Sequence, residues 1–331
     1  MDGPAPPVLA INELPIALAR TRSLTRTPTG CIPIDEILHG GVESGRIVCL
    51  SGATGVGKSA LVLQVLVRAL IAKPRAQALV LDAVGGFDVV RLESIVQAAG
   101  ADADDVLGRV RIVRVFDFVG VQEAVDELKA GLMAPVAKTR RRDGRVLDSE
   151  DEESDEEEEG RVEMVVLDNL TSVVGPLLKS NYIQAQAVLG TFMRGLAELT
   201  RKFGLTTLVI NGVVMPRIRQ LPDQGGLNPT ARVQEPSPSI FAANTVRPAL
   251  GRSFAHYLDL HLLLSVLPKS ERDARIVYGG NKGDDSKERG QSMGTAEMVN
   301  VVEVLADRYS DRTRQWTAFR IEEGIELNSV F

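Results

Sequence analysis

The sequence predicts an α/β fold in which a mostly parallel central sheet is flanked by helices and closed by antiparallel strands. Three observations lead to this prediction. Short apolar runs alternate with segments of helical periodicity through the first two thirds of the chain, a pattern typical of parallel sheets covered on both faces. Further apolar runs near the C-terminus fit antiparallel closing strands. The 331 residues, 44% of them hydrophobic, are ample for one large α/β core.

The elements follow one another in a regular order. A short helix around Ile34 and Leu38 is expected before the first strand, and it ends at Gly40-Gly41. The expected strands are Arg46–Ser51, Ala78–Asp82, Arg109–Val115, Val162–Asp168, Leu205–Asn211 and Tyr257–Val266, and the closing strands are Arg275–Tyr278, Met298–Leu305 and Thr317–Ile321. The expected helices between them are Ser59–Ala72, Asp88–Ala99, Val121–Leu132 and Ile183–Phe203.

Domain organisation is predicted from breaks in composition. Residues 1–26 read as a flexible N-terminal tail and residues 27–331 as one core. Residues 134–160 join a basic cluster to an acidic run, a composition that predicts a disordered insertion. The basic cluster fits a nuclear localisation signal and equally a solvated linker.

The net charge of −6 is dominated by that acidic run. Asp148–Glu159 holds ten acidic residues, and without them 34 acidic residues face 38 lysines and arginines. The folded part is therefore mildly basic, which permits nucleic-acid binding without requiring it. Aromatic residues make up only 4% of the chain, which argues against a broad base-stacking platform.

A long loop, residues 213–246, is rich in proline, glycine, arginine and glutamine. Loops of this length are either functional or without fixed structure. Arg217, Arg219 and Arg232 are candidates for contact with a phosphate backbone, and a solvated loop is an equal alternative.

The strongest motif lies between the first strand and the first long helix. It matches G-x-x-x-x-G-K-[ST] and consists of Gly52, Ala53, Thr54, Gly55, Val56, Gly57, Lys58 and Ser59. Glycines let backbone N–H groups face an anion, and the following helix N-terminus adds a favourable partial charge. Lys58 is expected to reach the outer phosphates and Ser59 to ligate Mg²⁺. The sequence therefore predicts a binding site for a nucleoside triphosphate.

Asp168 ends an apolar strand, V-E-M-V-V-L-D. An acid at the carboxyl end of a parallel strand lies near the crevice where α/β sheets bind ligands. Paired with the phosphate loop, Asp168 is expected to hold Mg²⁺ through water.

Other site classes are not supported. Cys31 and Cys49 have neither a metal-ligand spacing nor the number for a disulfide framework, which implies a reducing compartment. No apolar run reaches the roughly 18 residues of a membrane span, and no signal-peptide core follows Met1.

The ordered motifs resemble the ATPase core of the RecA-type recombinases, in particular the eukaryotic strand-exchange recombinase and its paralogues. They are T-G-x-x-x-x-D at Thr29–Asp35, the phosphate loop, L-V-L-D-A-V-G-G-F, V-V-L-D-N, L-V-I-N, and R-P-A-L-G-R-S-F at Arg247–Phe254. Arg111–Leu128 and Val165–Leu178 look most like the D-type paralogue. The likeness covers roughly residues 27–325 and implies a RecA-like P-loop ATPase core.

The sequence departs from that family at two positions. Matching the motif after the second strand places Val84 where the active recombinases carry a glutamate that orients the attacking water. The phosphate-sensing polar residue falls on Gly212, beside Asn211. Valine and glycine cannot hydrogen-bond a water through their side chains. Asp82 and Glu93 are other carboxylates nearby, but neither matches the position of the water. The resemblance thus implies nucleotide binding with slow turnover.

The resemblance also implies a role. It indicates a nuclear accessory protein in homologous recombination and DNA repair, which acts with other recombinase paralogues to load or stabilise the recombinase on single-stranded DNA. Loops 173–182 and 213–246 are expected to respond to ATP. The alternative is a DNA-dependent ATPase acting directly on DNA, with a carboxylate supplied in trans by a neighbouring subunit. The family's helical N-terminal domain and polymerisation motif have no counterpart in residues 1–28, so long filaments of this chain are not expected.

Overall fold

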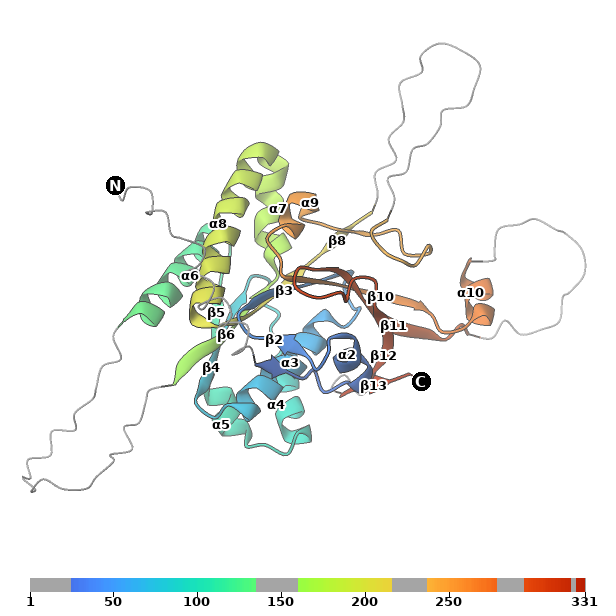
Figure 1. Cartoon of the computed structure of the whole chain (residues 1–331), viewed down its shortest axis with the longest axis horizontal. Helices are drawn as coiled ribbons and strands as arrows, with labels where there is room; N and C mark the ends of the chain where they lie inside the picture. Colours follow the sequence, from blue (N-terminus) through green and yellow to red (C-terminus); the bar gives the residue numbers. More distant parts are fainter. Residues whose placement is uncertain (1–24, 135–159, 216–236, 279–294, 323–325, 331) are drawn as a thin grey trace, which may run out of the picture.

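The fold was obtained as a computed structural model that describes residues 25–134, 160–215, 237–278, 295–322 and 326–330. Within these residues a large twisted sheet carries helices on both faces (Figure 1). The predicted α/β class, with a mostly parallel sheet and antiparallel closing strands, is confirmed.

The central sheet holds nine of the described strands, and its order explains where the site lies. From one edge to the other it contains β13 (Glu326–Ser329), β12 (Trp316–Glu322), β11 (Met298–Asp307), β10 (Leu260–Pro268), β3 (Arg46–Gly52), β7 (Thr206–Asn211), β6 (Arg161–Asp168), β4 (Ala76–Asp82) and β5 (Val110–Arg114). The strands from β10 to β5 pair in parallel, whereas β10 to β13 pair antiparallel. The carboxyl ends of the parallel strands therefore share one edge.

Two small ladders accompany this sheet. They are β1 (Arg26–Thr27) with β2 (Val42–Glu43), and β8 (Val213–Val214) with β9 (Arg247–Pro248). The second ladder brings the two ends of the long loop together, since β8 begins two residues after β7 ends.

Helices cover both faces of the sheet, and alternate residues of each strand point to opposite faces. Val48 and Leu50 of β3 join one apolar core, and Ile47 and Cys49 join the other. The first face carries α2 (Ile32–Ile37), α3 (Lys58–Ala72), α4 (Val89–Ala98) and α5 (Ala103–Gly108), and the second carries α6 (Phe118–Met133), α7 (Leu170–Ser180), α8 (Tyr182–Phe203) and α9 (Gly251–Ala255).

The expected closing strand Arg275–Tyr278 is wrong. These residues form the C-terminal half of a helix, α10 (Glu271–Tyr278), which buries none of its side chains. Its start is stabilised locally, because the Asp273 backbone N–H donates to Ser270 Oγ and the Ser270 hydroxyl donates to the Asp273 carboxylate, 2.6 Å away. This capping arrangement outweighs the β propensity of the Ile276-Val277-Tyr278 run.

The prediction of a loop at residues 173–182 is also wrong. Helix α7 covers Leu170–Ser180 and starts at Asn169, whose side chain accepts the Ser172 N–H at 2.8 Å. Because Gly175 and Pro176 lie inside the helix, the sequence pattern does not indicate a helix there. Pro176 lies within the apolar turn Val173–Leu177, where burial of Val173 and Val174 offsets the lost hydrogen bond.

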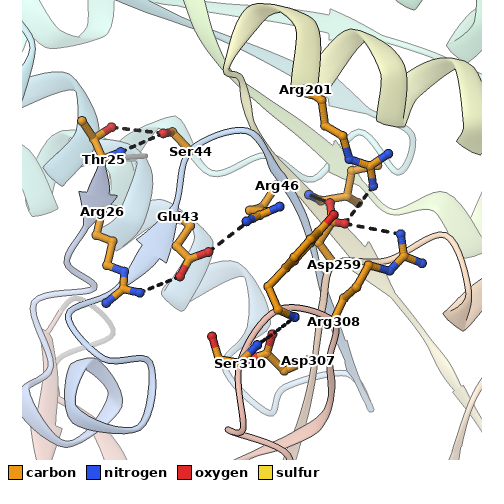
Figure 2. Close-up of polar contacts among 12 residues, drawn as sticks. Thr25, Arg26, Glu43, Ser44, Arg46, Arg201, Asp259, Asp307, Arg308 and Ser310 are labelled. Carbon is orange, nitrogen blue, oxygen red and sulfur yellow. Dashed lines mark hydrogen bonds and ion pairs between the residues drawn. The ribbon is translucent and has the colours of Figure 1, made fainter. Parts of the chain in front are cut away.

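An ion-pair network lies where β3 and β10 begin, at the end of these strands away from the phosphate loop (Figure 2). Asp259 is only 2% exposed and directly precedes β10. Its carboxylate accepts the Ile47 backbone N–H at 2.9 Å and a 2.9 Å bond from Arg201, and Arg308 lies 3.6 Å away. A buried carboxylate needs such partners, so this network helps to fix β10 beside β3.

Candidate nucleotide site

The phosphate loop joins the end of β3 to the start of α3. Gly55 and Gly57 have φ angles of 84° and 94°, a left-handed conformation that favours glycine. Gly57 is the N-cap of α3, so no side chain caps the first turn of the helix. The uncapped N–H groups and the helix dipole suit an anion in the loop.

Lys58 is folded back over this loop. Its ammonium group donates to the carbonyl oxygens of Gly52 at 2.9 Å and Ala53 at 2.6 Å. Burial lowers the pKa of Lys58, and the nearby Asp168 carboxylate opposes that effect. These two groups are thus close enough to interact electrostatically.

Asp168 ends β6 directly beside Asp82, which ends β4. Burial, and after it the negative charge of Asp82, raise the pKa of Asp168 to about 6, although Lys58 opposes both effects. A cation placed here would relieve the repulsion between the two acids. Hard cations such as Mg²⁺ prefer oxygen ligands, so the carboxylate of Asp168 and the hydroxyl of Ser59 have the right chemistry for the predicted metal.

Asp82 is already engaged by the chain that follows it. Its carboxylate accepts backbone N–H groups of Val84 at 3.1 Å, Gly85 at 2.8 Å, Gly86 at 3.3 Å and Phe87 at 3.2 Å. Burial works against ionisation, but these four donors hold the pKa of Asp82 below its usual value. Asp82 therefore organises the turn after β4, and its oxygens are poorly placed to accept a proton from water.

The two family departures lie where the sequence placed them, next to the carboxyl ends of β4 and β7. Val84 sits on the turn held by Asp82, and its side chain is 62% exposed. Gly212 follows β7, and its backbone N–H donates to Thr171 Oγ1 at 2.7 Å. Glu93 lies on α4, where its side chain accepts a hydrogen bond from Gln97, one turn later on the same helix.

A chain of buried polar side chains under the site was missed by sequence reasoning. Thr171 donates to Asn211 Oδ1 at 2.6 Å, Asn211 Nδ2 donates to Ser51 Oγ at 3.0 Å, and Ser51 lies 2.8 Å from His261 Nε2. Burial lowers the pKa of His261 to about 4, so the imidazole is neutral. The signal in the sequence was a polar residue inside otherwise apolar strands: Ser51 in β3, Asn211 in β7 and His261 in β10.

The remaining candidates fall outside the described residues. These are Arg217, Arg219 and Arg232, the tail up to residue 24, and nearly all of the expected insertion. In the part of the chain that is described, no helix has the length and apolar character needed to cross a membrane.

Comparison with known proteins agrees with the resemblance seen in the motifs. Residues 29–211 match the family model described as AAA domain. The chain is 26% identical to DNA repair protein RAD51 homolog 4 of Bos taurus over 71% of this chain and 60% of that protein. It is 29% identical to DNA repair protein RAD51 of Saccharomyces cerevisiae over 59% of this chain and 44% of the relative.

A third relative is the DNA repair and recombination protein RadB of Thermococcus sibiricus, which is 24% identical over 56% of this chain and 67% of its own length. The chain thus spans about 60% of the length of its RAD51 homolog 4 relative. The AAA match covers more than half of the chain and includes the phosphate loop, Asp168 and β7. The chain is therefore a member of the AAA domain family, similar to the RAD51-type recombinase paralogues.

Proposed function

We propose that this chain binds ATP with Mg²⁺ and serves as an accessory protein in homologous recombination and DNA repair. The observation that supports it best is the placement of Lys58 over the phosphate loop, within electrostatic reach of Asp168. Residues 52–59 would hold the triphosphate, Ser59 would ligate the metal, and Asp168 would hold it through water. Relatives named as DNA repair proteins motivate the cellular role.

Slow turnover follows from the same geometry. Phosphoryl transfer depends on positioning and electrostatics, including a group that orients the attacking water. Val84 stands where that group is expected, and Asp82 is held by four backbone N–H groups. ATP then acts mainly as a structural ligand that stabilises the bound form by mass action.

The partners we propose are other recombinase paralogue subunits and the strand-exchange recombinase, assembled on single-stranded DNA in the nucleus. The β8–β9 ladder connects the site to the long loop, since Gly212 N–H bonds to Thr171 and the next residue begins β8. Nucleotide-dependent changes at Thr171 would thereby reach residues 213–246, where Arg217, Arg219 and Arg232 remain the proposed DNA contacts.

Two measurements test this function. Equilibrium binding and turnover of ATP are measured with and without single-stranded DNA, for the wild type and for Lys58→Ala. We expect ATP binding by the wild type, slow turnover, and affinity reduced roughly 10- to 100-fold in the variant, because a charge-assisted contact is lost. Rapid DNA-dependent turnover would instead support an ATPase that acts directly on DNA.

The cellular role is tested by co-purification. The wild type and Lys58→Ala are recovered from cells, with Lys202→Ala as a control at an exposed lysine away from the loop. Recovery of recombinase paralogues with the wild type and the control, but less with Lys58→Ala, supports an ATP-dependent assembly. Recovery of no recombination protein with any of the three contradicts the accessory role.

A further inference from the structure

The phosphate loop is held in place by a hydrogen bond from a strand that is far away in sequence. The side-chain amide of Asn300 in β11 donates to the carbonyl oxygen of Val56 at 3.2 Å, across 244 residues of chain. β11 is separated from β3 by β10 alone. The Val56 side chain is itself buried, with 5% exposure. Val56 is thus held at two points, by its side chain and by its carbonyl group.

The position of this bond matters because of the residues on either side. Gly55 and Gly57 both have positive φ angles, and glycine is the residue with the widest choice of backbone conformations. A loop with glycines flanking Val56 pays a large entropic cost to adopt one shape. Fixing the Val56 carbonyl removes that freedom at the centre of the loop.

The direction of the bond also sets the direction of an anion-binding donor. A trans peptide unit is planar, so the C=O of one residue and the N–H of the next point in opposite directions. The Val56 carbonyl points to the side-chain amide of Asn300. The Gly57 N–H therefore points away from Asn300, so the same bond fixes the direction of one N–H donor of the loop.

Asn300 is itself held firmly. It is in register with Val266 of β10 and with Phe319 of β12, so strands pair with it on both sides. A Cβ atom added at Gly57 would lie 2.8 Å from Ile321 and 3.5 Å from Phe319, both in β12. The antiparallel strands thus contact two consecutive residues of the loop.

We propose that Asn300 is a positioning residue for nucleotide binding, which acts by fixing the Val56–Gly57 peptide in the orientation that binds phosphate. This inference rests on the proposed binding of ATP at residues 52–59. It assigns to the antiparallel part of the sheet a direct role in the site, beyond closing the fold.

The test compares Asn300→Ala and Asn300→Asp with the wild type. Binding of a non-hydrolysable ATP analogue with Mg²⁺ is measured at pH 8, and hydrogen exchange of the peptide covering residues 53–58 is measured without nucleotide. Loss of one net hydrogen bond should weaken binding roughly three- to tenfold in Asn300→Ala. Exchange in residues 53–58 should become faster while the middle of α3 stays unchanged.

Asn300→Asp separates positioning from packing. The carboxylate has the shape of the amide but no donor at pH 8, so the bond to Val56 is lost while the volume at this position is kept. We expect its affinity to fall at least as far as that of Asn300→Ala, with the same faster exchange in residues 53–58 before nucleotide is added. Asn328→Ala is the matched control, because Asn328 donates to Glu322 at 2.9 Å in β13 and β12 and makes no bond to the loop.

Each outcome decides the matter. Wild-type affinity and exchange in Asn300→Ala, or wild-type exchange in residues 53–58 of Asn300→Asp, overturn the inference and leave ATP binding intact. If the wild type binds the analogue no better than Lys58→Ala, the proposed function fails and the inference falls with it. Should Asn300→Ala not fold, hydrogen exchange in residues 53–58 of Asn300→Asp carries the test.

Discussion

Asp82 and Asp168 are register partners at the carboxyl ends of the neighbouring parallel strands β4 and β6. Their surroundings shift the pKa values of the two acids in opposite directions. Four backbone N–H groups keep the pKa of Asp82 low despite its burial, whereas burial and the charge of Asp82 raise the pKa of Asp168 to about 6. One acid therefore builds the turn, and the other is available to a cation.

The first prediction concerns stability. Because the pKa of Asp168 is about 6 in the folded protein and near 3.8 in the unfolded chain, the folded state binds more protons between these values. Ionised Asp168 therefore destabilises the nucleotide-free protein as pH rises from about 4 to 6, by roughly 1–3 kcal/mol. Asp168→Asn should be more stable than the wild type at pH 7.5 and equal to it near pH 4, as measured by urea unfolding. Equal stability at both pH values would contradict this.

The same substitution should have the opposite effect on ligand binding. Asp168→Asn removes the negative charge that is expected to hold Mg²⁺ through water, so the affinity for ATP with Mg²⁺ should fall roughly tenfold at pH 7.5. The difference from the wild type should shrink as pH falls below about 6, because the wild-type carboxylate becomes protonated. Calorimetric titration at several pH values checks this. A difference that does not change with pH would argue against a role for the Asp168 charge.

His261 should make the protein sensitive to acid. Its pKa is about 4 in the folded state and near 6.5 when unfolded, so the unfolded chain binds more protons between these values. The stability contributed by neutral His261 is present above pH 6.5 and is lost as pH falls toward 4, in total roughly 3 kcal/mol.

His261→Gln tests this, since an amide side chain can still bond to Ser51. Its unfolding free energy should change less between pH 6.5 and 4 than that of the wild type, when both are measured by urea denaturation in the Asp168→Asn background. That background removes the opposing contribution of Asp168. An unchanged slope would show that the pKa of His261 is the same in the folded and unfolded states.

Gly52 should not tolerate a side chain. A Cβ atom there would lie 2.6 Å from the carbonyl oxygen of Leu264, its register partner in β10. Gly52→Ala should destabilise the protein by about 1–3 kcal/mol through overpacking. Gly86→Ala is the control, because nothing lies within 4 Å of its added Cβ, and it should change stability by less than about 0.5 kcal/mol. Thermal unfolding that gave both variants the same stability would contradict the tight packing of β3 against β10.

Val84→Glu should raise turnover if the missing glutamate limits hydrolysis. The Val84 side chain is 62% exposed, so a glutamate fits without burying a charge. General-base groups typically contribute about 10²–10⁴-fold, and we expect at least a tenfold gain in DNA-stimulated ATP hydrolysis. Val84→Gln, of similar size but without a basic carboxylate, should show no such gain. Equal rates in all three proteins would mean that another group, such as the side chain absent at Gly212, limits the reaction.

Much of the site could be predicted because its parts are local in sequence. A strand, a glycine-rich turn and a helix follow one another within residues 46–72, and each depends on neighbouring residues only. The same holds for the apolar strand that ends in Asp168. Prediction was wrong for Arg275–Tyr278, where the capping pair Ser270 and Asp273 favours a helix, and for α7, where Gly175 and Pro176 obscured the pattern.

The sequence by itself determined the α/β class, the phosphate loop, the acid at the end of β6 and the departures at Val84 and Gly212, since each is written in a short run of residues. Only the tertiary structure decided the order of strands, and with it which distant side chains meet. It placed Asp82 beside Asp168, His261 beside Ser51, and Asn300 within hydrogen-bonding distance of Val56. The physical reason is that strand pairing joins segments by backbone hydrogen bonds that any sequence can make, so the partners are chosen by packing of the whole core.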